Sequence, residues 1–465
     1  MEGRLSRIAL ALTRLAERWL PDAFVFALAA TVIVFVAGLA IGVPAGQLVT
    51  AWGTSFPDLL AFAMQMALVI VTGYVVATAR PVRRAIDGLA RLPRSARGAV
   101  ALVAAFAMAS SWINWGFSLV FSAVLARAIA RRFARDHRRV DYRALGAASL
   151  LGVGSIWAQG LSGSAALQMA TPGALPPKIR AVIENGGVIP GGLVSFAHTV
   201  FLWQSLASVA IEIVVVTLVM WLAAPSESSA RDAATLGVAL DDPDAPEPPP
   251  STPGEKIEHS PILTIAIVAL GAVYLARTFA GGLTTLTVNT INLALLLVGM
   301  LLHWTHARLM RAVRDAVPAT WGVILQFPFY AAIAGMIAAT KLNDRIAHLF
   351  VSVSSARTFP ALMSAYSAAL GVFVPSGGSK WVIEAPYVIK AAHELRVHIG
   401  WVVACYDLGE AVANLVQPFW MLPVLALLGL RARDVMGYTF LVFLVLLPLV
   451  LILTTLLGTT LAYPL

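Results

Sequence analysis

The feature that most constrains this chain is a set of long apolar runs without a single charged residue. Four of them are Leu59–Ala79, Ala316–Thr340, Ala411–Leu430 and Val435–Leu465. A helix needs about 20 consecutive apolar residues to cross the hydrocarbon core of a bilayer. Strands that cross a membrane show short segments of alternating polarity instead. The runs therefore predict an all-α membrane protein.

The composition agrees with lipid as the main solvent. Only 12% of the residues are charged, against about 25% in soluble domains. The net charge of +9 would suit a nucleic-acid partner, but the arginines cluster between the apolar runs. Such a distribution keeps basic residues on the cytoplasmic side of a membrane, so we expect no nucleic-acid partner. The single cysteine, Cys405, excludes an intramolecular disulfide and a cysteine metal cluster.

The arginine-rich loops also predict the topology. With the basic N-terminus in the cytoplasm, the chain crosses the bacterial cytoplasmic (inner) membrane about nine times, and the C-terminus lies in the periplasm. The expected crossings are 21–43, 56–79, 144–177, 192–222, 261–280, 286–302, 317–340, 400–430 and 436–460.

Two further apolar segments predict re-entrant hairpins. The uncharged run Gly98–Ala126 lies between two arginine-rich loops that both favour the cytoplasm. One crossing would violate the charge rule, and two would need about 40 residues. A hairpin over about 98–126 that breaks at Ser110–Gly116 satisfies both constraints. A second hairpin is expected over about 358–391, with its break at Pro375–Ser379.

The chain divides into two similar halves. Residues 225–260 are rich in proline and acidic residues and predict a flexible linker between halves 1–224 and 261–465. Each half has a span, a hairpin, a broken span (about 144–174 and 400–430) and a further span. Similar segments start at Gln65 and Gln326. Inverted repeats with discontinuous helices indicate a secondary transporter; chance similarity among apolar helices is the alternative.

The breaks supply the candidate substrate site. Glycine lets the backbone approach a ligand, small hydroxyl and amide side chains offer donors and acceptors, and helix N-termini attract anions. Small residues that only permit close helix packing are the alternative interpretation. The substrate-binding candidates are Asn114, Ser162, Gly163, Ser164, Thr171, Ser376, Gly377, Gly378, Ser379, Lys380, Asn414 and Gln417.

Ionisable residues inside a membrane are usually functional. Lys380 follows the second hairpin break and is a candidate cation for an anionic substrate. A helix pair with Glu384, one turn later, is the alternative. The candidates for binding a coupling Na⁺ or H⁺ are Asn114, Ser162, Ser376, Asp407 and Glu410. Alternatively, one of the two acids serves only to neutralise Lys380.

Two other ionisable residues in a predicted span and the enzyme-like motifs carry less weight. Glu212 and His198 lie in a span without a nearby break, so we interpret both as structural. His393 and His398 are one residue too far apart for a zinc-protease helix. The sequence also has no phosphate-binding loop. We therefore expect no enzyme and no cofactor, apart from Na⁺ or H⁺ as the coupling ion.

Eight tracts between Trp19 and about Gly437 carry a family resemblance. They are RWLPDAFVFAL, DLLAFAMQMALVIVTGYVVA, INWGFSLV, SGSAALQMATPG, TVNTINL, QFPFYA, VPSGGSKWVIEAPYVI and GEAVANLVQPFWMLP. In these tracts the chain resembles the bacterial short-chain fatty acid transporter family, which is similar to the ion-transporter superfamily. The resemblance implies a homodimer with scaffold and transport domains. It also implies uptake of monocarboxylates such as butyrate or acetoacetate by Na⁺ or H⁺ symport and alternating access.

The sequence leaves three other functions to be weighed. A carrier of dicarboxylates or other organic anions on the same fold would favour a second basic group at the site, and we find none. An intramembrane hydrolase would need a nucleophile and a base, and the sequence shows no convincing pair. A channel is disfavoured by the discontinuous repeats.

Overall fold

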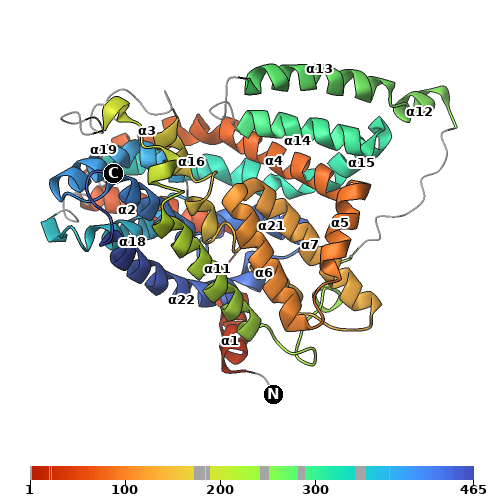
Figure 1. Ribbon diagram of the computed structural model, residues 1–465, viewed down its shortest axis with the longest axis horizontal. Coiled ribbons are helices and arrows are strands. Elements are labelled where there is room, and N and C mark those ends of the chain that lie inside the picture. The colour runs from red at the N-terminus through yellow and green to blue at the C-terminus, as the bar shows by residue number, and fades with distance from the viewer. Residues whose placement is uncertain are drawn as a thin grey trace.

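The computed structural model describes residues 3–19, 21, 23–171, 184, 189–240, 251–280, 288–340, 352–375 and 377–465. Within these ranges every regular element is a helix (Figure 1), so the predicted all-α class is confirmed.

The first half contains these helices: α1 (Arg4–Trp19), α2 (Ala23–Ala40), α3 (Ala45–Ser55), η1 (Phe56–Leu59), α4 (Leu60–Thr78), α5 (Arg80–Ala90), α6 (Ala96–Ile113), α7 (Trp115–Arg135), α8 (Tyr142–Ser149), η2 (Ile156–Gln159), α9 (Ser164–Ala170), η4 (Pro190–Gly192), η5 (Phe196–His198) and α11 (Trp203–Ala223). The predicted span 192–222 thus begins later than expected, at Trp203, because short 3-10 turns precede it.

The second half contains α12 (Pro253–Glu258), α13 (Ile262–Phe279), α14 (Val288–His303), α15 (His306–Ala316), η8 (Val317–Ala319), α16 (Trp321–Thr340), α18 (Phe359–Gly371), α19 (Gly377–Glu394), α20 (Ile399–Ala413), η9 (Phe419–Met421), α21 (Leu422–Leu428) and α22 (Ala432–Gly458).

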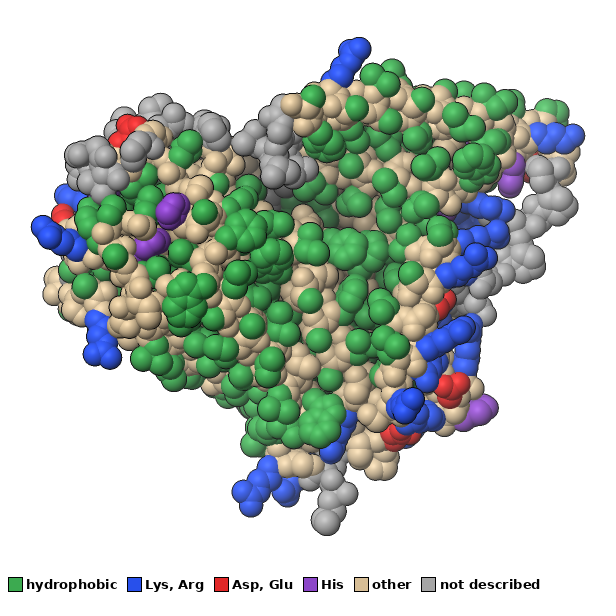
Figure 2. Space-filling view, viewed as in Figure 1, with side chains coloured by type: hydrophobic (Ala, Val, Ile, Leu, Met, Phe, Trp, Pro, Cys, Tyr) green, Lys and Arg blue, Asp and Glu red, His purple; other side chains and the backbone are tan. Residues whose placement is uncertain are grey.

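Several helices have the length and composition of membrane spans. Five do so among the described residues, or up to seven if two bent helix pairs each count as one span. The five segments are Ala45–Thr78, Ala96–Ile113, Trp203–Ala223, Pro253–Phe279 and Ala432–Gly458. Hydrophobic side chains are spread over the whole central part of the face in Figure 2, as expected of a surface in contact with lipid. The total of nine crossings stays a prediction.

The first predicted hairpin is a pair of antiparallel helices that breaks at Asn114. The Asn114 Oδ1 atom accepts a hydrogen bond from the Phe117 amide at 2.9 Å, which caps the start of α7. The Ser118 hydroxyl donates to the Ala107 carbonyl of α6 at 2.7 Å, so the two helices lie side by side. Because α6 alone is long enough to cross a membrane, the re-entrant path stays a prediction.

The two broken spans are also present, and the first break is longer than expected. Helix α8 ends at Ser149 and α9 begins at Ser164. The interruption therefore starts well before the predicted glycine-rich stretch at Gly160. In the second half, α20 ends at Ala413, and turns separate it from α21.

Corresponding helices make corresponding contacts in the two halves. Helix α6 packs on α8 and α11, and α18 packs on α20 and α22. Helix α7 reaches across to α21 of the other half, as α19 reaches across to α9. The internal repeat and the inverted orientation of its copies both stay predictions.

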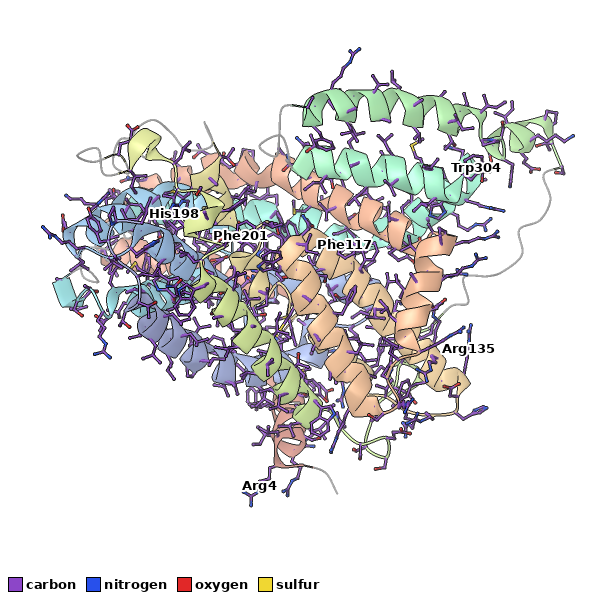
Figure 3. The ribbon with its side chains drawn as sticks, in the orientation of Figure 1. Arg4, Phe117, Arg135, His198, Phe201 and Trp304 are labelled. Atoms are coloured by element: carbon purple, nitrogen blue, oxygen red, sulfur yellow. The ribbon has the colours of Figure 1, made fainter. Side chains whose placement is uncertain are left out.

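Lys and Arg side chains are most frequent toward one end of the molecule, with a few at the left and upper margins of Figure 2. Lys and Arg side chains line the right-hand and lower margins in Figure 2, and Figure 3 shows Arg4 and Arg135 at these margins, away from His198. In Figure 1 helix α1, at the start of the chain, lies at the bottom, and the C-terminus lies at the left. Which end faces the cytoplasm stays a prediction.

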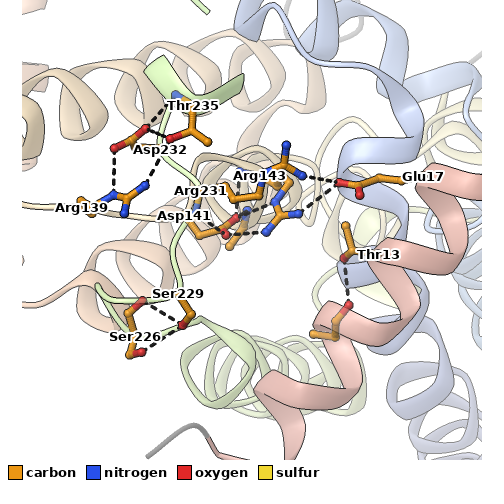
Figure 4. Close-up of polar contacts among 12 residues, drawn as sticks. Thr13, Glu17, Arg139, Asp141, Arg143, Ser226, Ser229, Arg231, Asp232 and Thr235 are labelled. Carbon is orange, nitrogen blue, oxygen red and sulfur yellow. Dashed lines mark hydrogen bonds and ion pairs between the residues drawn. The ribbon is translucent and has the colours of Figure 1, made fainter. Parts of the chain in front are cut away.

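A buried arginine organises this charged end. Arg143 is 3% exposed and pairs with Asp141 at 2.8 Å and with Glu17 of α1 at 3.1 Å (Figure 4). Burial alone would lower the pKa of Arg143, but the two carboxylates raise it above the ordinary arginine value. Arg231, from the predicted linker, also pairs with Glu17, at 3.3 Å. The first part of that linker is therefore held against the charged end rather than free.

Candidate substrate and cation site at the helix breaks

The tip of the first hairpin is bound to the first broken span. The Trp115 amide donates to the Ser162 hydroxyl at 3.0 Å. The Leu161 amide donates to the Trp112 carbonyl at 2.8 Å. Backbone groups that have no helical partner at the two breaks thus satisfy one another, as buried polar groups must.

The second hairpin and the second broken span join the same region. The Asn414 side chain, at the end of α20, donates to the Val153 carbonyl of the first break at 3.0 Å. The Trp420 indole donates to the Pro375 carbonyl at 3.0 Å, and its ring meets the Trp115 ring with 5.2 Å between centroids. All four predicted breaks are therefore linked through direct contacts.

Lys380 forms a buried ion pair with Glu410. The Lys380 ammonium contacts a Glu410 carboxylate oxygen and donates to the Ser367 carbonyl at 3.1 Å. The side chains of Lys380 and Glu410 are 3% and 0% exposed. Of the two pairings that the sequence left open, the structure forms the one between α19 and α20. Lys380 is therefore already neutralised in this arrangement.

Glu384 has different partners. Its two carboxylate oxygens accept hydrogen bonds from the Tyr366 hydroxyl, at 2.7 Å, and from the Tyr406 hydroxyl. The Lys380 ammonium also lies 5.7 Å from the centroid of the Tyr406 ring, within cation–π range. The predicted helix pair between Lys380 and Glu384 is replaced by a network of tyrosines that the sequence analysis missed. No spacing rule marks these tyrosines, because they come from two other helices.

Asp407 links α20 to the start of α9. Its Oδ2 atom accepts a hydrogen bond from the Ala165 amide at 3.0 Å. Its Oδ1 atom is buried and has no hydrogen-bond partner among the described residues. A Cβ atom at Gly163 or at Gly377 would lie 3.1 Å from an Asp407 oxygen, so the two glycines permit this close approach.

The remaining candidates are placed as follows. Gly378 accepts a hydrogen bond at its carbonyl from the Gln168 side chain at 3.2 Å, and a Cβ atom at Gly378 would lie 3.7 Å from Ser164. Gln417 instead donates to the Tyr330 hydroxyl at 2.9 Å.

Of the last three candidates, the structure describes the side chain of Thr171 alone. Thr171 bonds back to its own helix through the Leu167 carbonyl at 2.7 Å. Ser376 lies outside the described residues, and so does the side chain of Ser379.

The charges of this region do not balance. Lys380 is buried together with three acids, Glu384, Asp407 and Glu410, all at most 3% exposed. Full ionisation would therefore leave two negative charges uncompensated in a nearly dry interior, which costs several kcal/mol per ion, roughly. An arrangement of this kind can take up cations, either protons or Na⁺. No group of three or more His, Cys, Asp or Glu side chains in the described ranges is placed to hold a metal ion.

A bundle of apolar helices whose internal breaks surround buried charges has the architecture of a membrane carrier. The family described as "Short chain fatty acid transporter" matches residues 4–457. The chain belongs to this family, which confirms the predicted membership and the prediction that it is not an enzyme. It is accordingly a multi-pass membrane protein.

Two relatives carry a provisional name as short-chain fatty acid transporters. The protein from Escherichia coli (strain K12) is 38% identical over 444 residues, which cover 94% of this chain and 96% of the relative. The protein from Haemophilus influenzae is 33% identical over 437 residues, which cover 93% and 96%.

Two solved transporters are more distantly similar. One is the Alcanivorax borkumensis YdaH transporter, with 15% identity, a TM-score of 0.44, and coverage of 93% of this chain and 98% of that one. The other is Neisseria gonorrhoeae MtrF, of a class of antimetabolite efflux pumps, with 14% identity, a TM-score of 0.45, and coverage of 95% and 97%.

Proposed function

We propose that this chain carries short-chain fatty acids and related monocarboxylates, such as butyrate and acetoacetate, across the bacterial cytoplasmic membrane. Transport is by symport with H⁺ or Na⁺ and by alternating access, and the working unit is a homodimer. The observation that carries the proposal is the ion pair of Lys380 with Glu410 at the second hairpin break.

This ion pair couples the binding of the substrate carboxylate to the binding of the coupling cation. A substrate carboxylate competes with Glu410 for the Lys380 ammonium. A cation that neutralises Glu410 frees the ammonium, so cation binding strengthens anion binding, and the reverse follows by thermodynamic linkage. Asp407, with one unpartnered carboxylate oxygen among the described residues, is a second candidate for the cation. The loaded site holds the substrate anion and the cation together. It therefore carries less net charge through the membrane than a site that holds the anion alone.

Aromatic side chains near Lys380 suit a small monocarboxylate. The Trp157 ring packs against Gly377, and the Trp381 and Tyr406 rings lie 5.0 Å apart between centroids. The indole N–H groups of Trp157 and Trp381 are buried, and neither has a hydrogen-bond partner in the part of the chain that the structure describes. Indole N–H groups only donate, so they suit a carboxylate, while the rings accommodate a short alkyl chain.

The number of basic groups favours one carboxylate over two. Lys380 is the basic side chain that the described contacts place at the breaks. The buried Arg143 lies at the charged end, bound to Asp141 and Glu17. A dicarboxylate would bring a second negative charge without a partner.

The test is uptake of labelled butyrate or acetoacetate into proteoliposomes under imposed Na⁺ and pH gradients. Protein-free vesicles give the diffusion baseline. We expect saturable uptake that one gradient drives and that succinate inhibits weakly. Lys380→Met should abolish uptake, whereas Lys390→Met, on the exposed face of the same helix, should not. Absence of saturable monocarboxylate uptake contradicts the proposal, and stronger uptake of succinate supports the dicarboxylate alternative.

A further inference from the structure

A second buried carboxyl group lies outside the Lys380 cluster. Glu212 is in the middle of α11 and is 0% exposed. It is the only charged residue in this helix, which is otherwise apolar enough to span a membrane. An acid at such a position is costly and is rarely kept without a function.

The partners of Glu212 are few and neutral. Its Oε1 atom accepts hydrogen bonds from the Gln159 amide at 2.7 Å and from the Ser208 hydroxyl at 2.8 Å. Its Oε2 atom is buried and has no hydrogen-bond partner among the described residues. A carboxylate in this environment would carry an uncompensated charge, so the surroundings stabilise the protonated, neutral form.

Charged groups on the neighbouring elements lie elsewhere. Helix α6 contributes Arg97, whose guanidinium lies over the Trp221 ring, about 14 Å along α11 from Glu212. The basic helix α1 approaches α11 near Leu222, where its Gly3 lies. Arg97 and the start of α1 thus lie at the C-terminal end of α11.

The other two contacting elements bring no charge to Glu212 either. Helix α22 meets the start of α11 where the Gln204 side chain donates to Thr460 at 2.9 Å. Its ionisable residues, Arg433, Asp434 and Tyr438, all lie in its first third, at the far end. The turn η2 has no ionisable residue.

Through Gln159, Glu212 is connected to the first helix break. The next residue, Gly160, packs so tightly on the first hairpin that a Cβ atom would lie 2.2 Å from the Trp112 carbonyl oxygen. Further along the same segment, Gly163 meets Asp407. Glu212 therefore bonds to one end of the short segment from Gln159 to Gly163, and Asp407 lies against its other end.

We propose that Glu212 is a binding site for a coupling proton, and that loading and release of this proton reposition the break from Gln159 to Gly163. When the proton leaves the carboxyl group for water on one side of the membrane, the carboxylate needs more donors than Gln159 and Ser208 supply. The break must then move or admit water. The inference rests on the proposed function, because a coupling proton requires a carrier.

The main experiment compares proton and substrate movement in proteoliposomes. A pH-sensitive dye in the lumen reports protons, and labelled butyrate reports substrate, after subtraction of protein-free vesicles. We expect Glu212→Gln to lower the number of protons moved per butyrate, while butyrate exchange at equal concentrations continues. Glu212→Asp, which keeps a titratable group, should restore proton movement. The control Gln204→Met removes another buried polar contact of α11 and should leave the ratio unchanged.

An infrared measurement gives a readout besides transport. The C=O stretching region of buried carboxylic acids should lose one component in Glu212→Gln relative to the wild type. An unchanged proton ratio in a folded Glu212→Gln protein, or an unchanged band, overturns the inference. If that variant does not fold, Gln159→Met tests the same connection, and an unchanged ratio overturns it too. If the wild type shows no saturable uptake, the proposed function fails, and the infrared band still decides whether Glu212 holds a proton.

Discussion

The ion pair between Lys380 and Glu410 allows the effect of replacing each residue on the stability of the protein to be predicted. Each side chain is at most 3% exposed, and each is the ionic partner of the other. Removing one partner leaves the other as an uncompensated buried charge, which typically costs about 3–5 kcal/mol. Lys380→Met and Glu410→Gln should therefore each destabilise the protein by an amount of this order. The double variant removes both charges of the pair and should be more stable than either single variant.

The two single variants should also differ in their response to pH. In Lys380→Met the lone carboxyl group of Glu410 can take up a proton, so the loss of stability should be smaller in acid. In Glu410→Gln that carboxyl group is absent, so the loss should not become smaller in acid. Thermal unfolding of the detergent-solubilised protein at several pH values measures both effects.

A double-mutant cycle gives the refuting result. Coupling between contacting residues is usually 0.5–3 kcal/mol, roughly, and residues without contact show additive effects. Additive destabilisation by Lys380→Met and Glu410→Gln would show that the pair does not form. The same substitution also tests the transport proposal. Glu410→Gln leaves the Lys380 ammonium free, so this variant should bind butyrate without the coupling cation.

Two further predictions concern other parts of the molecule. Gly377→Ala places a Cβ atom 3.1 Å from an Asp407 oxygen, so we expect transport to fall several-fold in a protein that still folds, as measured by uptake against size-exclusion profiles. Although partial burial alone would raise the pKa of Asp232, hydrogen bonds from Thr235 and Arg139 lower it below the usual range. Its contribution to stability is therefore present above about pH 4 and is lost as the pH falls through the lowered pKa. Protease cleavage of the loop around Asp232 should rise with acidification in the wild type, and Asp232→Asn should remove that dependence.

Three helices were not predicted from the sequence because of their charge pattern. Helices α1, α5 and α15 carry arginines at regular intervals, so they contain no long uncharged run. An amphipathic pattern marks such helices as surface elements, whereas the search for spans depends on uninterrupted apolar sequence. The dependence on apolar runs also misplaced the start of the first break. The residues after Ser149 are as apolar as the helix before them, so nothing in the pattern marks the end of that helix.

The sequence by itself determined the class of the protein and most of its interruptions. Long uncharged runs require lipid and helices, because unpaired backbone groups are too costly in hydrocarbon. Asn114 could be predicted as a break because a short polar side chain caps a helix. The family resemblance was likewise present in the linear tracts.

Only the tertiary structure decided which charges meet. Lys380 is one helical turn from Glu384, so its position in the sequence allows that pair as readily as one with Glu410. Packing of α20 against α19 brings Glu410 to the ammonium, and two tyrosines occupy the carboxylate of Glu384. The same kind of packing joins Glu212 to Gln159 of the first break. Pairings of this kind depend on how separate helices dock, and no local spacing rule contains that information.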